Sequence, residues 1–527
     1  MTEHVAFLAT ELFEPAGGLY RYTTNLLQAW DKKLENDETD LEPLIISVKN
    51  PNKPMKDLSH SERFSELTDR HEHLSVYEAE RGGRTVYFVE GEVPDLDRFH
   101  YELWDRYRIP SDVSSHWDGY NSTLSPFWYW APKLIEFLME EEGLKFKAAD
   151  AQDWLAFPAG FLTMDDRDIP LNCRIHSGEY GRSLGNINNR GAPVWIEAGS
   201  LAFSDYIQGV SINETRFELR NLMSFKKSLV RKLREDRGED WSQYQEYRDR
   251  KLQEFLIFEK TEELVMLRDL VGGMPNGIFL DDWDDLEAED IEEGRSMLER
   301  FLPGKEQFIF FIGRPVYRKG IDFLIDAFAE TVDKHPEAGL VLASSMSEED
   351  KEGYEDKLEE LGIREDVHLL TRWLEDREKK SIFTASDIIA LPSVYEPFGI
   401  VALEALAADY AAEENGYTGP AVVVGDTGGM DEITQSGESG MEVPTQDFEI
   451  DPDLLDQVFC SLMPGNIKEE VEHDSQTLRE RISSNGAERV QDEKFRWDYI
   501  LDRVFEVYDR AEENHEEKKQ LLEGGPD

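Results

Sequence analysis

Short apolar runs alternate along this chain with longer segments in which apolar residues recur at helical spacing. The first run is nearly all apolar, as a strand buried on both faces of a parallel sheet requires. The runs occupy residues 4–10, 44–48, 85–91, 171–175, 307–313, 340–343, 367–370, 386–391 and 421–424. Helical segments follow several of them, such as the segment that carries Leu26, Leu27 and Trp30. The alternation predicts an α/β fold with doubly wound, parallel, Rossmann-like sheets.

The length of 527 residues exceeds what one hydrophobic core serves, so we expect two such domains. The first spans residues 1–275 and the second spans residues 276–494. An amphipathic helix over 495–512 is expected to pack back on the first domain, and a polar tail follows over 513–527. Residues 213–269 are charged and predict a helical insertion. No heptad is sustained there, which favours a solvated insertion over an oligomerisation arm.

The charge balance is strongly acidic, with 57 Lys and Arg against 112 Asp and Glu and a formal net charge of −55. Binding to nucleic acid or to an anionic membrane requires a basic face, so both are excluded as partners. The acidic residues are spread over the whole length. We therefore interpret them as the solvated surface of a halophilic protein, whose mutual repulsion must be screened by salt.

Cysteine usage and the start of the chain bear on compartment and metal content. Cys173 and Cys460 lie in different expected domains, which argues against a disulfide framework or a cysteine metal site. No His/Asp cluster has the spacing of metal ligands. The start lacks a basic region followed by an apolar core, and no apolar run approaches about eighteen residues. We expect a cytoplasmic protein with no transmembrane segment and no bound metal. The sequence does not decide between a monomer and a homo-oligomer.

The stretch from residue 386 to residue 406 reads as a strand, a Gly/Pro loop and a helix. Pro392 closes the strand, and the helix begins near Val401. In an open parallel sheet such a loop faces the crevice where ligands bind. This stretch is therefore the first place to look for a functional site.

Two carboxylates belong to this stretch, Glu396 in the loop and Glu404 on the helix. Both can face one ligand, and the backbone N–H groups of Phe398, Gly399 and Ile400 open the helix as a phosphate site. By themselves, two glutamates in so acidic a chain fit a solvated helix start better.

A second loop of the later domain concentrates positive charge. Arg314 and Lys319 lie between Gly313 and Gly320, where a strand gives way to a helix. A bidentate guanidinium and a compact ammonium suit a pyrophosphate, and in so acidic a chain the pair favours binding over a solvated turn.

Other candidates lie at strand ends, and most of them have a structural alternative. A lone Gly-Gly is usually a turn, Asp153 fits a helix cap, and His176 fits a hydrogen-bonded structural residue. The candidates are Gly17, Gly18, Gln152, Asp153, His176, Glu179 and Arg182 in the first domain and Thr427, Gly428 and Gly429 in the second.

The block Glu-Pro-Phe-Gly-Ile-Val-Ala-Leu-Glu-Ala, which begins at Glu396, resembles the paired-glutamate signature of a known family. The family is that of retaining nucleotide-sugar glycosyltransferases with two Rossmann-like domains, the GT-B type, including glycogen and starch synthases. The resemblance implies that Glu396 contacts the donor sugar and that Glu404 binds the ribose. The Gly-Arg-x-x-x-x-Lys-Gly spacing resembles the family's second motif, which implies that Arg314 and Lys319 hold the donor phosphates.

Shorter blocks follow in the family's order. His-Ser-x-Glu-x-Gly-Arg resembles the loop that faces the sugar, which implies donor- or acceptor-contacting roles for His176 and Arg182 and, less directly, for Glu179. Gly17-Gly18 and the Thr-Gly-Gly at residues 427–429 resemble loops that approach the donor's phosphates and sugar.

Two positions depart from the family's pattern. Gln152 stands where the family's His-Asp-Trp block has its histidine, and an amide cannot ionise. Glu14-Pro15-Ala16 replaces the lysine that bacterial-type enzymes place before Gly17, which bears on an ADP-sugar preference.

The resemblance implies an enzyme that moves a hexosyl unit from a nucleotide-diphosphate sugar to a growing α-glucan. Glucose is the leading candidate for that unit. The substrate would be UDP-glucose or ADP-glucose, with no tightly bound cofactor. Alternatives are a glycosyltransferase that makes a surface polysaccharide, a glycolipid or a small glycoside, and a non-catalytic sugar-nucleotide-binding regulator.

Overall fold

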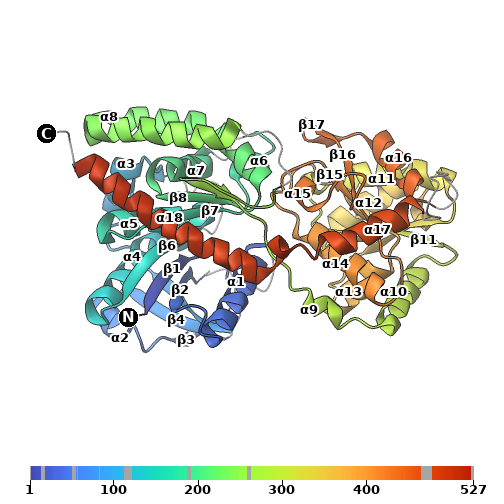
Figure 1. Ribbon diagram of the computed structural model, residues 1–527, viewed down its shortest axis with the longest axis horizontal. Coiled ribbons are helices and arrows are strands. Elements are labelled where there is room, and N and C mark those ends of the chain that lie inside the picture. Colours follow the sequence, from blue (N-terminus) through green and yellow to red (C-terminus); the bar gives the residue numbers. More distant parts are fainter. Residues whose placement is uncertain are drawn as a thin grey trace. The chain divides into compact units, whose positions relative to one another are not determined.

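The computed structural model describes residues 2–12, 18–49, 55, 57–81, 83–111, 121–186, 191–257, 263–463 and 477–523. The chain divides into two compact units, unit 1 with Met1–Gly277 and Trp497–Asp527, and unit 2 with Ile278–Arg496 (Figure 1). Each unit is α/β around a largely parallel sheet, which confirms the predicted class of two Rossmann-like, doubly wound domains.

Unit 1 is built on a ten-stranded sheet in the order β3-β4-β5-β2-β1-β6-β7-β8-β10-β9. The inner strands pair in parallel, whereas β3, β4 and β9 form antiparallel pairs toward the edges. The strand order reverses between β1 and β6, the kind of switch point at which open α/β sheets bind ligands. The strands are β1 (Glu3–Leu8), β2 (Leu41–Val48), β3 (Ser59–His60), β4 (Leu74–Arg81), β5 (Arg84–Gly91), β6 (Lys145–Gln152), β7 (Leu171–Ile175), β8 (Tyr206–Gly209), β9 (Met266–Leu267) and β10 (Val271–Gly273).

The helices of unit 1 include one long element, α8 (Ile212–Ile257), over the charged segment. It is a helical hairpin, because Gly238 (φ 84°) interrupts it and Lys226 Nζ in the first arm donates to the Gln245 carbonyl in the second at 3.3 Å. The others are α1 (Gly18–Glu35), α2 (Ser65–Arg70), α3 (Leu96–Tyr107), α4 (Asn121–Glu141), α5 (Asp153–Arg167), α6 (Glu179–Arg182) and α7 (Gly191–Phe203).

The terminal helix α18 (Trp497–Glu523) also belongs to unit 1, where it lies along the sheet (Figure 1). Tyr508 is fully buried, and its hydroxyl donates to Asp150 Oδ2 on β6 at 2.8 Å. The helix runs past residue 512, where the sequence pattern predicts a polar tail. The physical reason is that His515 Nδ1 hydrogen-bonds the buried Asp205 at 2.8 Å, which holds the extra turns against the core.

Unit 2 has a six-stranded parallel sheet in the order β13-β12-β11-β14-β15-β16, and its strand order reverses between β11 and β14. The strands are β11 (Gln307–Ile312), β12 (Ala338–Ala343), β13 (Val367–Leu370), β14 (Ile388–Leu391), β15 (Ala421–Gly425) and β16 (Met441–Val443), with a small hairpin of β17 (Thr445–Gln446) and β18 (Glu449–Ile450). The helices are α9 (Asp281–Asp284), α10 (Ala288–Phe301), α11 (Ile321–Lys334), α12 (Glu348–Glu360), α13 (Asp376–Ala385), α14 (Ile400–Glu414), α15 (Met430–Ile433), α16 (Pro452–Leu462) and α17 (Leu478–Arg489).

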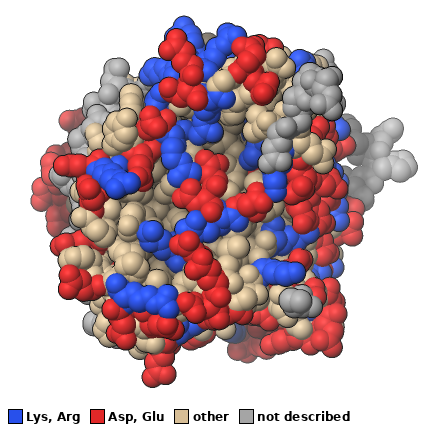
Figure 2. Space-filling view, turned by 90° about the vertical axis from the view of Figure 1, so that its left-hand side faces the viewer, with Lys and Arg blue, Asp and Glu red and all other residues tan. Residues whose placement is uncertain are grey.

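The surface of unit 1 is dense in charge. Figure 2 looks onto the side of unit 1 at the left of Figure 1, where acidic side chains cover much of the face and basic ones stand among them. Several basic side chains of this unit are in ion pairs, such as Arg63 with Glu142 at 2.7 Å and Arg106 with Asp166 at 2.8 Å. Within the described ranges, none of the helices combines the length and the apolarity that crossing a bilayer requires.

Candidate active-site loops in the two units

The loops after β11 and β14 meet at the switch point of unit 2. The Val394 N–H donates to the Arg318 carbonyl at 2.9 Å, which ties the loops together. Gly320 has a φ of +73°, and a Cβ there would lie 1.9 Å from the carbonyl oxygen of Pro392. A side chain at this position would force the loops apart.

The loop after β15 packs against the same place. The Gly429 N–H donates to the Pro397 carbonyl at 2.9 Å. Gly428 has a φ of +56°, and a Cβ there would lie 1.9 Å from the carbonyl oxygen of Glu396. Three strand ends that are far apart in sequence therefore bring Lys319, Glu396 and Thr427–Gly429 into one neighbourhood.

An ion pair joins two of the predicted site residues. Lys319 Nζ donates to Glu396 Oε2, and the two side chains are 20% and 17% exposed. Arg314, in the same loop as Lys319, is exposed and has no ion pair within the described part of the chain. Of these two predicted site cations, Lys319 is already neutralised by a carboxylate and Arg314 faces solvent.

The second predicted carboxylate lies on α14. Gly399, with a φ of +97°, precedes the helix, Ile400 begins it and Phe398 is buried beside it. The first N–H groups of a helix have no intrahelical acceptor, so this end suits an anion. Glu404, one turn on, accepts from Lys379 Nζ of α13 at 2.8 Å, and that lysine side chain is only 7% exposed. No motif in the sequence marks Lys379 as a site residue.

In unit 1, the candidates at the end of β6 have unusual backbone and charge. Gln152 ends the strand, and Asp153 begins α5 with a φ of +59°, which a non-glycine residue rarely adopts. Burial raises the pKa of Asp153 to about 7, although the Arg182 charge and the His176 backbone N–H act in the opposite direction. Of the glycine pair, Gly18 begins α1, and Gly17 lies outside the described residues.

His176 follows β7 and contacts both residues at the end of β6. Its Nε2 lies 2.7 Å from Gln152 Oε1, and its backbone N–H donates to Asp153 Oδ1 at 2.6 Å. The Tyr22 ring of α1 packs edge-on against the imidazole, with 4.6 Å between ring centroids. Burial and then the Arg174 charge hold the pKa of His176 well below its ordinary value, which favours the neutral imidazole.

Glu179 and Arg182 lie on the short helix α6 next to His176. Arg182 Nη1 donates to Glu179 Oε1 at 3.0 Å, and Trp154 Nε1 donates to the same oxygen at 3.2 Å. Glu179 is fully buried, so its carboxylate acts here as the acceptor that fixes the guanidinium. The structure therefore brings Gln152, Asp153, His176, Glu179 and Arg182 into one cluster.

Two further carboxylates accept hydrogen bonds from the backbone of residues 178–182, which we call the 178–182 loop. The sequence pattern did not reveal them. Glu197 of α7 accepts from the Glu179 N–H, with oxygens at 2.9 and 3.2 Å. Glu218 of α8 accepts from the Gly181 N–H at 3.2 Å. Burial first, and then the charges of Glu218 and Glu179, raise the pKa of Glu197 well above its ordinary value.

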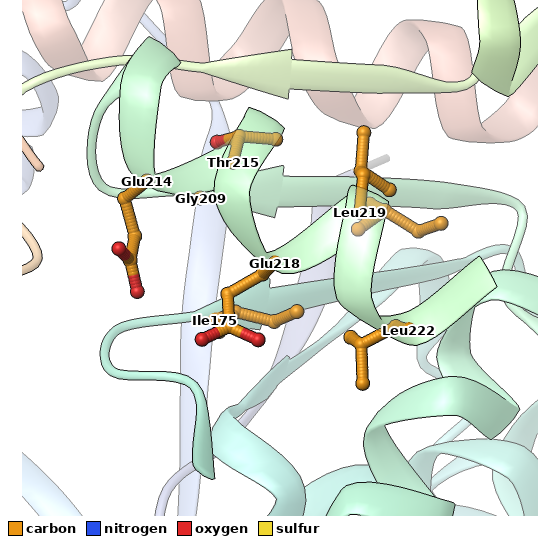
Figure 3. A pocket seen from close by; sticks show the side chains of 8 residues that line it. Ile175, Gly209, Glu214, Thr215, Glu218, Leu219 and Leu222 are labelled. Carbon is orange, nitrogen blue, oxygen red and sulfur yellow. The ribbon is translucent and has the colours of Figure 1, made fainter. Parts of the chain in front are cut away.

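A small cavity adjoins the 178–182 loop. Figure 3 shows Glu214 and Glu218 on the first turns of α8, with both carboxylates below the helix and Ile175 of β7 beside Glu218. The cavity holds about 10 Å³, room for about one water and far too little for a sugar. Its lining is Ile175, Ile207, Gly209, Glu214, Thr215, Glu218, Leu219 and Leu222.

Comparison with known proteins finds a family match within the second unit. Residues 296–450 match the family model described as "Glycosyl transferases group 1". An uncharacterized glycosyltransferase of Methanocaldococcus jannaschii is 35% identical over 212 residues, which cover 40% of this chain and 46% of that protein. A D-inositol 3-phosphate glycosyltransferase of Corynebacterium urealyticum is 31% identical over 212 residues, covering 33% of this chain and 47% of that protein. The chain thus spans about half the length of these curated relatives.

Solved structures resemble the chain over nearly its whole length. Anabaena HepE in complex with UDP-glucose is 14% identical with a TM-score of 0.58, and the match covers 96% of this chain and 99% of that one. The catalytic domain of Starch Synthase IV from Arabidopsis thaliana, bound to ADP and acarbose, is 17% identical with a TM-score of 0.58, covering 97% and 99%. At such identities the likeness concerns the fold, which is GT-B. The family match over residues 296–450 is what supports the expected enzyme class, a glycosyltransferase.

Proposed function

We propose that the protein is a retaining glycosyltransferase that moves a hexosyl unit from a nucleotide-diphosphate sugar to an acceptor hydroxyl, with glucose as the leading candidate for that unit. The observation that carries this proposal is the meeting of three loops at the switch point of unit 2, which joins Lys319 to Glu396 and packs Gly428 on the Glu396 backbone. Phosphate-binding cations, a carboxylate and close backbone approach are the parts that a nucleotide-sugar donor requires.

The chemistry follows from these groups. Arg314 and Lys319 hold the donor diphosphate, and Lys319 exchanges its bond to Glu396 for a phosphate oxygen. Glu396 is then released to stabilise positive charge on the sugar. The bond from sugar C1 to the leaving phosphate oxygen breaks, the acceptor oxygen bonds to C1 on the same face, and the leaving phosphate takes the acceptor's proton. Glu404 holds the ribose, and no enzyme nucleophile takes part.

For the acceptor we propose a growing α-glucan. The resemblance of the sequence blocks to glycogen and starch synthases supports this choice. A small phosphorylated acceptor is the second candidate, favoured by relatives named D-inositol 3-phosphate glycosyltransferase and mannosylfructose-phosphate synthase. We propose no metal in the reaction, because the leaving diphosphate has Arg314 and Lys319 as its counter-charges.

The test is nucleoside diphosphate release in molar KCl. UDP-glucose and ADP-glucose are offered separately, each with glycogen, with D-inositol 3-phosphate, or with no acceptor. Release that requires glycogen establishes a glucan synthase, and release that requires inositol phosphate establishes the second candidate. Lipid and short glycosides are offered as further acceptors. Donor binding without nucleoside diphosphate release in the presence of any of these acceptors contradicts the proposal and identifies a sugar-nucleotide-binding regulator.

A further inference from the structure

A buried row of polar side chains runs across the sheet of unit 1 beneath His176. Gln152 on β6 is in register with Arg174 on β7, which is in register with Gln208 on β8. All three are at most 1% exposed. Gln152 also precedes α5, yet its side chain makes no capping hydrogen bond to that helix. Capping therefore does not explain a glutamine at this position.

The surroundings of Gln152 orient its amide group. Asp150, two residues earlier on the same strand, presents a buried carboxylate. Burial raises the pKa of Asp150. Gln152 Nε2 is buried and makes no hydrogen bond within the described part of the chain, so the Asp150 carboxylate orients the amide by charge attraction. A carboxylate attracts the NH₂ end of an amide, so the oxygen end points away from Asp150 and toward His176, where Oε1 lies 2.7 Å from Nε2.

This contact decides which nitrogen of His176 carries the proton. An amide oxygen only accepts hydrogen bonds, so Nε2 must be the protonated nitrogen. Arg174 adds a positive charge beside the ring, which opposes a second proton. The remaining nitrogen, Nδ1, then carries a lone pair. His176 is partly exposed, and Nδ1 has no hydrogen-bond partner within the described part of the chain.

We propose that Gln152 is a positioning residue that holds His176 as the neutral tautomer with its proton on Nε2, so that Nδ1 accepts a hydrogen bond from a hydroxyl of the bound sugar. This inference rests on the proposed function. It also sets the class of group that faces His176: a hydroxyl donates to a lone pair, whereas a phosphate oxygen or a carboxylate repels it. The ring is thereby a hydroxyl-recognising group and not a general acid.

Gln152 suits this role because it does not titrate. The titratable or charged groups against His176 are Tyr22 from α1, Asp153 from α5 and Arg174 from β7. Tyr22 contributes a ring edge, Asp153 accepts from the His176 backbone N–H, and the Arg174 charge disfavours the imidazolium. None of these contacts supplies a proton to Nδ1.

The test combines a spectroscopic and a kinetic measurement on the full chain in molar KCl. Proteins labelled with ¹⁵N-histidine are compared as wild type, Gln152→Leu and Gln208→Leu, and a His176→Gln sample assigns the resonances. Gln208→Leu is the matched control, because it makes the same change in the same buried row and Gln208 makes no hydrogen bond to His176. Nucleoside diphosphate release and the melting temperature are measured for each protein.

We expect wild-type His176 to show a protonated Nε2 and a bare Nδ1 between about pH 6 and 8. In Gln152→Leu the tautomers should mix and kcat/KM should fall about tenfold, the effect of one misplaced hydrogen bond, while Gln208→Leu keeps both wild-type signatures. A proton on Nδ1 in the wild type overturns the inference. Equal losses of kcat/KM in Gln152→Leu and Gln208→Leu, with the His176 tautomer unchanged, also overturn it. If the wild type releases no nucleotide, the proposed function fails while the spectrum still decides the tautomer.

Discussion

Lys319 donates a hydrogen bond to Glu396 and thereby links the loop after β11 to the loop after β14. Both side chains are mostly shielded, at 20% and 17% exposure, so the pair is stronger than a solvated surface pair. A donor diphosphate competes with the carboxylate for the ammonium group. In the proposed mechanism, binding of the donor and release of Glu396 are therefore one event.

Replacing Lys319 with Met should lower kcat/KM by about 10²-fold or more, because a preorganised cation at the leaving phosphate is lost. Initial rates of nucleoside diphosphate release measure the effect. Lys357→Met serves as the control, since Lys357 pairs with Asp322 and Asp326 on α11 of the same unit. Wild-type kcat/KM in Lys319→Met would contradict the role.

Lys379 is expected to act through Glu404, whose carboxylate it binds at 2.8 Å. In Lys379→Met the carboxylate loses the partner that orients it toward the ribose, so the donor KM should rise about tenfold with little change in kcat. The neighbouring Lys380, which pairs with Asp376, provides Lys380→Met as the matched control. A fall in kcat at unchanged donor KM would assign Lys379 to a different step.

His515 should make the stability of unit 1 depend on pH. Burial lowers the pKa of His515, but hydrogen bonding and charge from Asp205 outweigh it and leave the pKa above its ordinary value. The folded state thus favours the imidazolium. This stabilisation is fully present below the unfolded pKa of about 6.5 and is lost as pH rises through the folded value.

His515→Gln should therefore destabilise the protein more at about pH 5.5 than at about pH 8.5, by about 1–3 kcal/mol at the lower pH. Urea unfolding at both pH values measures the difference. His73→Gln, at an exposed histidine, should show no such dependence. An equal loss at both pH values would show that His515 contributes by packing alone.

The net charge of −55 should make folding depend on salt. Self-repulsion of this size is screened only when the Debye length is short, so the melting temperature should rise steeply with KCl and the fold should be lost in low salt. Circular dichroism melts across a KCl series measure this, with sucrose at matched osmolality as the uncharged control. A melting temperature that is unchanged on removal of KCl would rule out the halophilic interpretation.

Local patterns predicted those parts of the molecule that depend on neighbours in sequence. Pro392 and the glycines bounding 313–320 marked the ends of β14 and β11, so the loops that carry Glu396 and Lys319 could be placed before the fold was known. The order of short motifs then indicated two Rossmann-like units. The first inference uses chemistry within about ten residues, and the second uses only the order of such local patterns along the chain.

Contacts between distant segments could not be predicted in this way. Lys379 lies on a charged helix with no motif around it, and only the fold places it on Glu404. Glu197 supports the 178–182 loop through a backbone N–H, which leaves no trace in the residue pattern. The last turns of α18 are held by Asp205, 310 positions away in the chain. The polar composition of those turns therefore predicted a tail where a docked helix lies.

The most direct test of the central claim compares wild type with Glu396→Gln in molar KCl for nucleoside diphosphate release and for donor binding by calorimetry. Gln keeps the size of the side chain and removes the charge that stabilises the sugar cation. We predict donor-dependent transfer by the wild type, with retained anomeric configuration in the product, and a loss of about 10³-fold in kcat for the variant with donor still bound. Transfer by Glu396→Gln at the wild-type rate, or an inverted product, would contradict the account.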